Sequence, residues 1–146
     1  MDRERLQHEE EEGWQALLRT FARVPSNRFD EPTLTPEGWS AKDAMFHVGY
    51  WLADCVRVLD TIAAGTFERA AEDAIDIEEL NAQGFARSRG METDAVRAGF
   101  LGARSRSLES FGRLESLTPD AWEWFEESGP LHYRKHVEDL DLWLQQ

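Results

Sequence analysis

The sequence predicts an all-α protein, a four-helix bundle with a long crossover between its second and third helices. Three observations lead to this prediction. Apolar residues recur at helical spacing in four long segments, and no segment shows the alternation of apolar and polar residues that is typical of a strand. The connection between the second and third long segments is extended, as in helical bundles that contain a crossover.

Length and composition predict one globular domain. A chain of 146 residues is long enough for one sizeable core and too short for two, so we expect a single domain over residues 1–146. A formal net charge of −13 repels phosphate backbones and anionic lipids, so no nucleic acid and no membrane is expected as a partner. No apolar run approaches the length of a membrane span, and no signal-peptide core begins the chain, so we expect a cytoplasmic protein.

The first two helices have clear boundaries in the sequence. The first is expected over residues 3–24, with its glutamate run (residues 9–12) facing solvent, and Pro25 ends it. The segment of residues 25–39 is short and contains apolar side chains, so we expect it to form an ordered connection between the first two helices. Ser40 is expected to cap the second helix in a capping box with Asp43, and Gly65 closes that helix.

The second half of the chain is predicted to hold the remaining helices. Residues 76–89 can form a helix with Ile77 facing inward and an interruption near Gly84. The third long helix should span residues 93–117. Thr118 and Pro119 then begin a short helix, and the last helix follows over residues 131–144.

The last helix contains the strongest chemical signal, the pair His132 and His136. At a spacing of four residues both imidazoles share one helix face, with Cβ atoms about 5–6 Å apart, near enough to hold one metal ion. His47 lies on an apolar stripe of the second helix. Each signal also has an ordinary alternative: two polar helix positions that happen to be four apart, or a hydrogen-bonded core histidine. Whether the three histidines meet depends on the fold.

At these residues the chain resembles the DinB-like metalloprotein family, which is related to the thiol-dependent maleylpyruvate isomerases and S-transferases. The segment from Gly38 to His47 (GWSAKDAMFH) is similar to the family's Gly-Trp-Ser-x-x-Asp-x-x-x-His segment, and the pair His132 and His136 is similar to its C-terminal histidines. Asn81, followed by Arg87, also resembles the stretch that enters the family's third helix. The resemblance covers essentially the whole chain.

The resemblance implies a DinB-like four-helix bundle that binds a divalent metal through His47, His132 and His136, at one end of the bundle in a cleft open to solvent. In the mycothiol-using branch a glutamate is expected where this chain has His132, so this departure points to the all-histidine branch. Three neutral imidazoles suit zinc, nickel, iron or manganese and leave a position for water or a low-molecular-weight thiol.

Other residues are candidates for supporting roles. Carboxylates that could orient the histidines are Asp43, Glu138 and Asp139, because a metal-bound histidine usually donates its second N–H to such a group. Trp51 lies one turn from His47 and is a candidate for the wall of a substrate pocket. The lone cysteine, Cys55, is expected to be a small core residue.

Three functions are open from the sequence. The first is a metal-dependent transferase or hydrolase that activates a thiol or water for a small-molecule substrate. The second is a non-catalytic protein of the stress response that binds a metal or a small molecule. The third is a purely structural bundle whose histidines bind nothing. A homodimer that forms through an apolar helix face is compatible with each, although the sequence identifies no interface.

Overall fold

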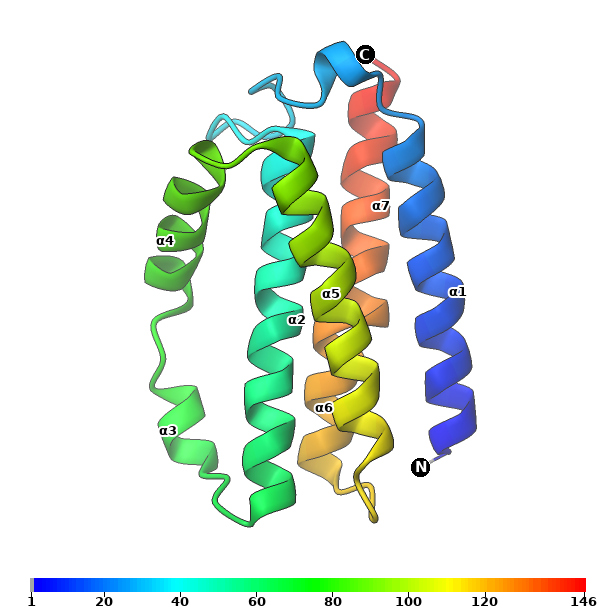
Figure 1. Cartoon of the computed structure of the whole chain (residues 1–146), viewed down its shortest axis with the longest axis vertical. Coiled ribbons are helices and arrows are strands. Elements are labelled where there is room, and N and C mark those ends of the chain that lie inside the picture. Colours follow the sequence, from blue (N-terminus) through cyan, green and yellow to red (C-terminus); the bar gives the residue numbers. More distant parts are fainter. Residues whose placement is uncertain (1) are drawn as a thin grey trace.

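The structure, a computed structural model, describes residues 2–146, and every regular element in that range is a helix (Figure 1). The all-α class predicted from the sequence is therefore confirmed. In chain order the elements are α1 (Arg3–Ala22), the 3₁₀ turn η1 (Ser26–Arg28), α2 (Ala41–Ala64), α3 (Arg69–Asp73), α4 (Ile77–Arg89), α5 (Thr93–Gly112), α6 (Pro119–Ser128) and α7 (Pro130–Leu144). None of the helices within residues 2–146 combines the length and the apolar character needed to cross a membrane.

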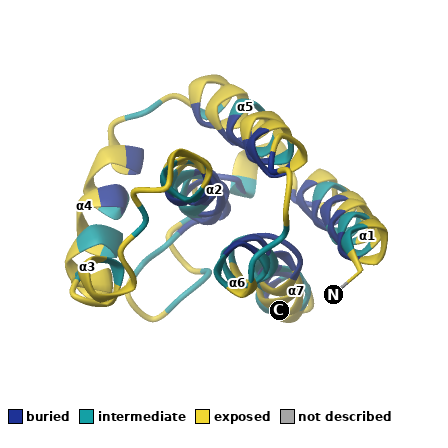
Figure 2. Cartoon of the chain, turned by 90° about the horizontal axis from the view of Figure 1, so that it is seen from below, coloured by how far each residue is buried: buried dark blue, intermediate teal, exposed yellow. Residues whose placement is uncertain are grey.

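The long helices stand side by side with their buried faces turned toward one another (Figures 1 and 2). α2 packs mainly on α5 and α1 on α7, whereas α6 packs on both α2 and α7. α3 and α4 lie beside α2 on the side away from α1 and carry the chain back to the end at which α2 begins (Figure 1). As a result α2 and α5 run in the same direction.

Aromatic side chains fill the interior in two clusters. In the larger cluster Trp14 of α1 stacks on Phe100 of α5, with ring centroids 4.5 Å apart, and Trp14 also contacts Tyr133 of α7. In the smaller cluster Phe111 of α5 stacks on Phe125 of α6 at 3.9 Å. These contacts join segments that lie far apart in the sequence, so burial of aromatic surface fixes how the helices meet.

The local signals for helix ends are confirmed at several positions. Ser40 caps α2, with the backbone N–H of Asp43 donating to its hydroxyl and its own N–H donating to the Asp43 carboxylate. Gly65 ends α2 with a φ of 75°, a left-handed conformation that favours glycine. Thr118 caps α6, and Pro119 is its first residue. These caps place both helices as the sequence predicts.

The prediction that the glutamate run faces solvent is wrong for Glu10, whose side chain is 1% exposed. Its carboxylate accepts a hydrogen bond from Tyr133 Oη at 2.8 Å and two from Arg104, from Nε at 3.0 Å and Nη2 at 2.7 Å. Glu10 therefore joins α1 to α5 and α7. These three residues are called the Glu10 network below.

Four further details differ from the sequence prediction. Ile77 is 51% exposed: it lies in the first turn of α4 and lines an open cavity with Trp51 of α2 instead of packing in the core. Gly84 does not interrupt α4; it is buried against α2, where a Cβ would lie 3.4 Å from the Phe46 ring. The sequence also did not predict α3, and α5 ends at Gly112 rather than near residue 117.

Candidate metal centre

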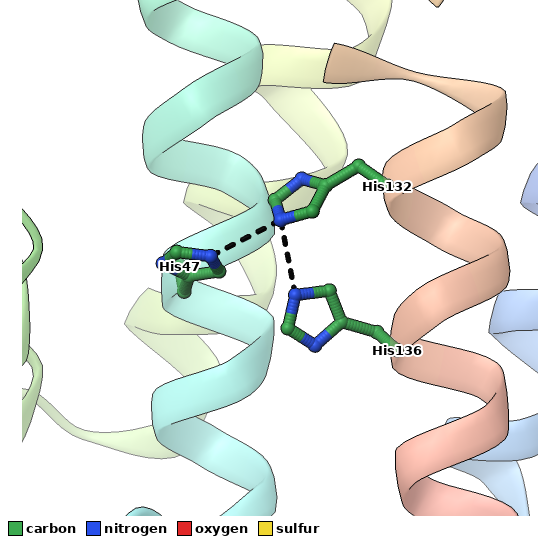
Figure 3. Close-up of side chains that lie close together, drawn as sticks. All are labelled: His47, His132 and His136. Atoms are coloured by element: carbon green, nitrogen blue, oxygen red, sulfur yellow. Dashed lines mark hydrogen bonds between the residues drawn. The ribbon is translucent and has the colours of Figure 1, made fainter. Parts of the chain in front are cut away.

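Three histidine side chains meet between α2 and α7 (Figure 3). His47 comes from α2, and His132 and His136 come from successive turns of α7. The Nε2 atom of His132 lies 3.1 Å from that of His47 and 3.0 Å from that of His136. One ligand nitrogen from each residue lies within 4.8 Å of the others. We call these three residues the histidine cluster; the fold brings together all three histidines that the resemblance implied.

The start of α2 is held by hydrogen bonds that also fix the position of His47. The Asp43 carboxylate, one turn before His47, accepts from the Ser40 backbone and hydroxyl and, at 2.5 Å, from the hydroxyl of Ser88 on α4. Trp39 lies edge-on to the His47 imidazole, with centroids 5.0 Å apart. The capped end, a neighbouring helix and an aromatic ring therefore restrict the imidazole.

The histidine cluster is neutral at pH 7. Burial, and then the nearby His132, lower the pKa of His47 to about 3. Burial lowers the pKa of His132 to about 4, although the Ser128 carbonyl opposes part of that shift. For His136, burial and the two other histidines lower the pKa well below its usual value. Neutral imidazoles keep the lone pairs that a metal ion requires.

The geometry and the donor set fit a divalent ion. Two nitrogens that are each about 2.0–2.1 Å from one ion lie roughly 2.9–3.4 Å apart at angles between 90° and the tetrahedral value. The two Nε2 separations of 3.0 and 3.1 Å fall in this range. Within residues 2–146 no carboxylate forms an ion pair with the cluster, and His132 Nδ1 is buried without a hydrogen-bond partner of normal geometry. The spacing of the Nε2 atoms therefore suits one shared ion, whereas the Nδ1 atom of His132 has, among the described residues, no acceptor in normal geometry to orient the ring.

The carboxylates expected to orient the histidines have different surroundings. Asp43 already accepts hydrogen bonds from Ser40 and Ser88. Glu138 is exposed and faces a shallow cavity between α1 and α7. Asp139 lines a cavity together with His132 and His136. A supporting role for these residues stays a prediction; Asp139 lines the same cavity as all three histidines, and Asp43 lies beside His47 in a tightly packed space.

Two cavities open onto the histidine cluster. The large cavity, about 640 Å³, lies between α2, α4, α7 and the segment before α2. It contains the carboxylates of Glu37, Glu78 and Asp139 and a single cation, Lys135, which lies 3.5 Å from Asp139. The small cavity, about 330 Å³, lies on the other side and includes Trp51. Both cavities fall within the size range of small-molecule sites.

Asn81 of α4 lines both cavities, and sequence reasoning did not assign it a role. Trp51 Nε1 donates to Asn81 Oδ1 at 2.8 Å, which leaves the amide N–H donors of Asn81 available to a bound molecule. Phe85, one turn further along α4, stacks on Trp39 at 5.7 Å. Asn81 and Phe85 are four residues apart and therefore share one face of α4. This spacing could have indicated that the face lines a cavity, but only if the packing of α4 against α2 had been known.

The fold and the site together define an all-helical protein in which three histidines from two helices meet beside two cavities. The family model described as the mycothiol maleylpyruvate isomerase N-terminal domain matches residues 11–137, a range that includes the whole histidine cluster. The chain therefore belongs to this DinB-like family. Comparisons with curated proteins and with solved structures gave no match.

Proposed function

We propose that this protein is a metal-dependent transferase or hydrolase that activates a thiol or water for a small-molecule substrate. The observation that carries the proposal is the convergence of three neutral imidazoles from α2 and α7 beside two cavities. Membership of a family described by a thiol-dependent isomerase supports it. We further propose that α1, α2, α5 and the α6–α7 column form the four-helix bundle of this family, with α3 and α4 as the crossover.

The histidine cluster would hold the ion, and zinc, nickel, iron and manganese each suit imidazole ligands. A bound ion supplies a Lewis acid that lowers the pKa of coordinated water or of a thiol. His132 adds no charge where a glutamate is expected in the mycothiol-using branch. The chain would therefore leave more of the positive charge of the ion available to stabilise a thiolate or hydroxide.

The two cavities provide space for two substrates beside the histidine cluster. A low-molecular-weight thiol in one cavity and an electrophilic small molecule in the other would meet at the histidine cluster. Asn81, oriented by Trp51, would donate a hydrogen bond to an oxygen of either molecule. The net charge of −13 supports a small-molecule partner in the cytoplasm rather than a nucleic acid or a membrane.

The first test is metal content. The purified, tag-free protein is reconstituted separately with zinc, nickel, iron and manganese and analysed by elemental analysis beside the variants His47→Ala and His132→Ala. The matched control is His8→Ala, because His8 is exposed and pairs with Glu12 on α1, away from the cluster. We expect about one equivalent in the wild type and the control, and loss in both cluster variants. A wild type that binds none of the four metals would refute the proposal.

The second test separates an enzyme from a sequestering protein. The loaded protein is mixed with N-acetylcysteine or mycothiol and 1-chloro-2,4-dinitrobenzene, so that a carbon–sulfur bond forms, chloride leaves and the thiol proton passes to solvent. We expect many turnovers, lost on chelation and in His132→Ala. Product that stops at one equivalent would instead support a non-catalytic binding protein of the stress response.

A further inference from the structure

A third cavity, about 440 Å³, lies between α2, α4 and α5 and contains none of the histidine cluster. We call it the arginine groove. Figure 2 shows α4 and α5 as separate neighbours of α2, and the residues that line the groove come from all three helices. Its volume falls within the range of small-molecule sites. The function proposed above makes no use of it.

The floor and walls of the groove are apolar. Phe46 and Tyr50 of α2 stack with centroids 6.0 Å apart on one wall, and Phe100 lies on the α5 side. On the floor a Cβ at Gly49 would lie 3.1 Å from Phe100 Cα, because the two helices approach closely there. A Cβ at Gly99 would meet nothing within 4 Å, so the floor is open at that residue.

The charges of the groove are opposite to those of the chain. Although the chain carries 29 acidic and 16 basic residues, three arginines and one aspartate line the groove. Arg57 is neutralised by Asp54 at 3.0 Å and by Glu72 at 2.7 Å. Within residues 2–146, neither Arg87 nor Arg106 forms an ion pair with a carboxylate. The groove therefore presents two uncompensated guanidinium groups beside apolar surface.

The two free arginines lie at opposite ends of the groove. The guanidinium of Arg87 lies 5.7 Å from the centre of the Phe46 ring, at the end where α2 begins. The contact of Gly49 with Phe100 and the hydrogen bond from Ser110 to Asp60 fix the register of α2 and α5. Arg106 consequently lies level with Arg57. Phe46 and Arg57 are separated by eleven residues, which is about 16 Å along a helix.

We propose that the arginine groove binds an amphipathic anion, an aliphatic carboxylate of about ten carbons. Its carboxylate pairs with Arg87, where Phe46 holds the guanidinium and no carboxylate competes. Its chain lies over Gly99 and Phe100 toward Arg57, in contact with apolar wall and floor. The arginine groove would thus favour anions, whereas the acidic large cavity would favour cations.

The test uses decanoate and decylammonium, which share a chain and differ in charge, in isothermal titration calorimetry with the full chain. We expect decanoate to bind with one equivalent, at least tenfold tighter than decylammonium. Arg87→Gln should weaken decanoate about tenfold, whereas Arg134→Gln, an exposed position outside the groove, should not change its affinity. Equal affinity for the two probes would overturn the proposal.

A second variant tests the position of the chain. Gly99→Leu fills the open floor, and it replaces an exposed helical glycine by a better helix former, so the variant should fold. We expect it to abolish decanoate binding. Unchanged binding in this variant would place the ligand elsewhere and overturn the proposal. The proposal would also be overturned if light scattering showed that the wild type is a dimer and that Gly99→Leu is a monomer. In that case a second copy of the chain would cover the groove.

Discussion

The Glu10 network predicts a large loss of stability from one substitution in the acidic run of α1. Glu10→Ala removes the buried acceptor of Tyr133 and of two partly buried Arg104 hydrogen bonds. Burial, followed by the charge and the hydrogen bond of Glu10, raises the pKa of Tyr133 well above its usual value. The phenol therefore stays a donor at any pH of interest and is left without its acceptor in the variant.

The magnitude follows from these contacts. Breaking a buried ion pair by removing one partner costs about 3–5 kcal/mol. Arg104 keeps one acceptor, because Nη2 also donates to Glu11 at 2.5 Å, so the lower end of the range applies. We expect Glu10→Ala to cost about 3 kcal/mol. Tyr133→Phe leaves the ion pair intact and should cost about 1.5–3 kcal/mol, the value of one hydrogen bond to a charged acceptor.

The assay is urea unfolding followed by circular dichroism at 222 nm. Glu109→Ala is the control, because Glu109 pairs with Arg113 four residues away on the exposed face of α5 and should change the free energy of unfolding by less than about 0.5 kcal/mol. The double variant of Glu10 and Tyr133 should cost less than the sum of the single losses. A Glu10→Ala variant within 1 kcal/mol of the wild type would refute the reasoning.

Three further predictions concern the site and the core. The metal-free protein should lose stability as the pH falls from 6.5 toward 4. The pKa values of His47 and His132, about 3 and about 4, lie below those of the same residues in the unfolded chain, so the unfolded chain binds more protons. At pH 5 the loss is about 2 kcal/mol per histidine, and in urea unfolding the free energy of unfolding should depend less steeply on pH in His47→Gln than in the wild type. Cys55, whose pKa burial raises to about 12, should react with Ellman's reagent only in urea, and rapid reaction in native buffer would contradict its burial. With cobalt bound, the acidic large cavity should bind the cationic thiol cysteamine about threefold to tenfold more tightly than the anionic thiol 3-mercaptopropionate at low salt, and this ratio should be smaller in Glu78→Gln. The cobalt–thiolate absorption band measures both affinities. A preference for 3-mercaptopropionate would contradict the negative charge assigned to the cavity.

The sequence predicts well those features that depend on neighbours in the chain. The cap at Ser40, the end at Gly65 and the start of α6 each follow from a few adjacent residues, and the structure has all three. The burial of Glu10 could be predicted only in part. Glu10 lies four residues after Leu6 and four before Trp14, on the buried face of α1, so the helical period marks it out from the other glutamates. The partners of its carboxylate are not local, because Arg104 is 94 residues away and Tyr133 is 123 residues away.

The histidine cluster was predictable only in part for the same reason. The spacing of His132 and His136 places both on one face of α7, but nothing local relates either to His47, 85 residues before His132. The link came from the order of short segments shared with a family, which stands in for the missing information on long-range contacts. The resemblance does not predict which cavity each residue lines. Asn81 and Arg87 belong to the same family-like stretch, but the packing of α4 on α2 places Asn81 beside the metal centre and Arg87 in the arginine groove. Six residues of α4, less than two turns, therefore separate two sites of opposite charge. Because α4 has few buried residues, a shift of this helix would alter both sites together.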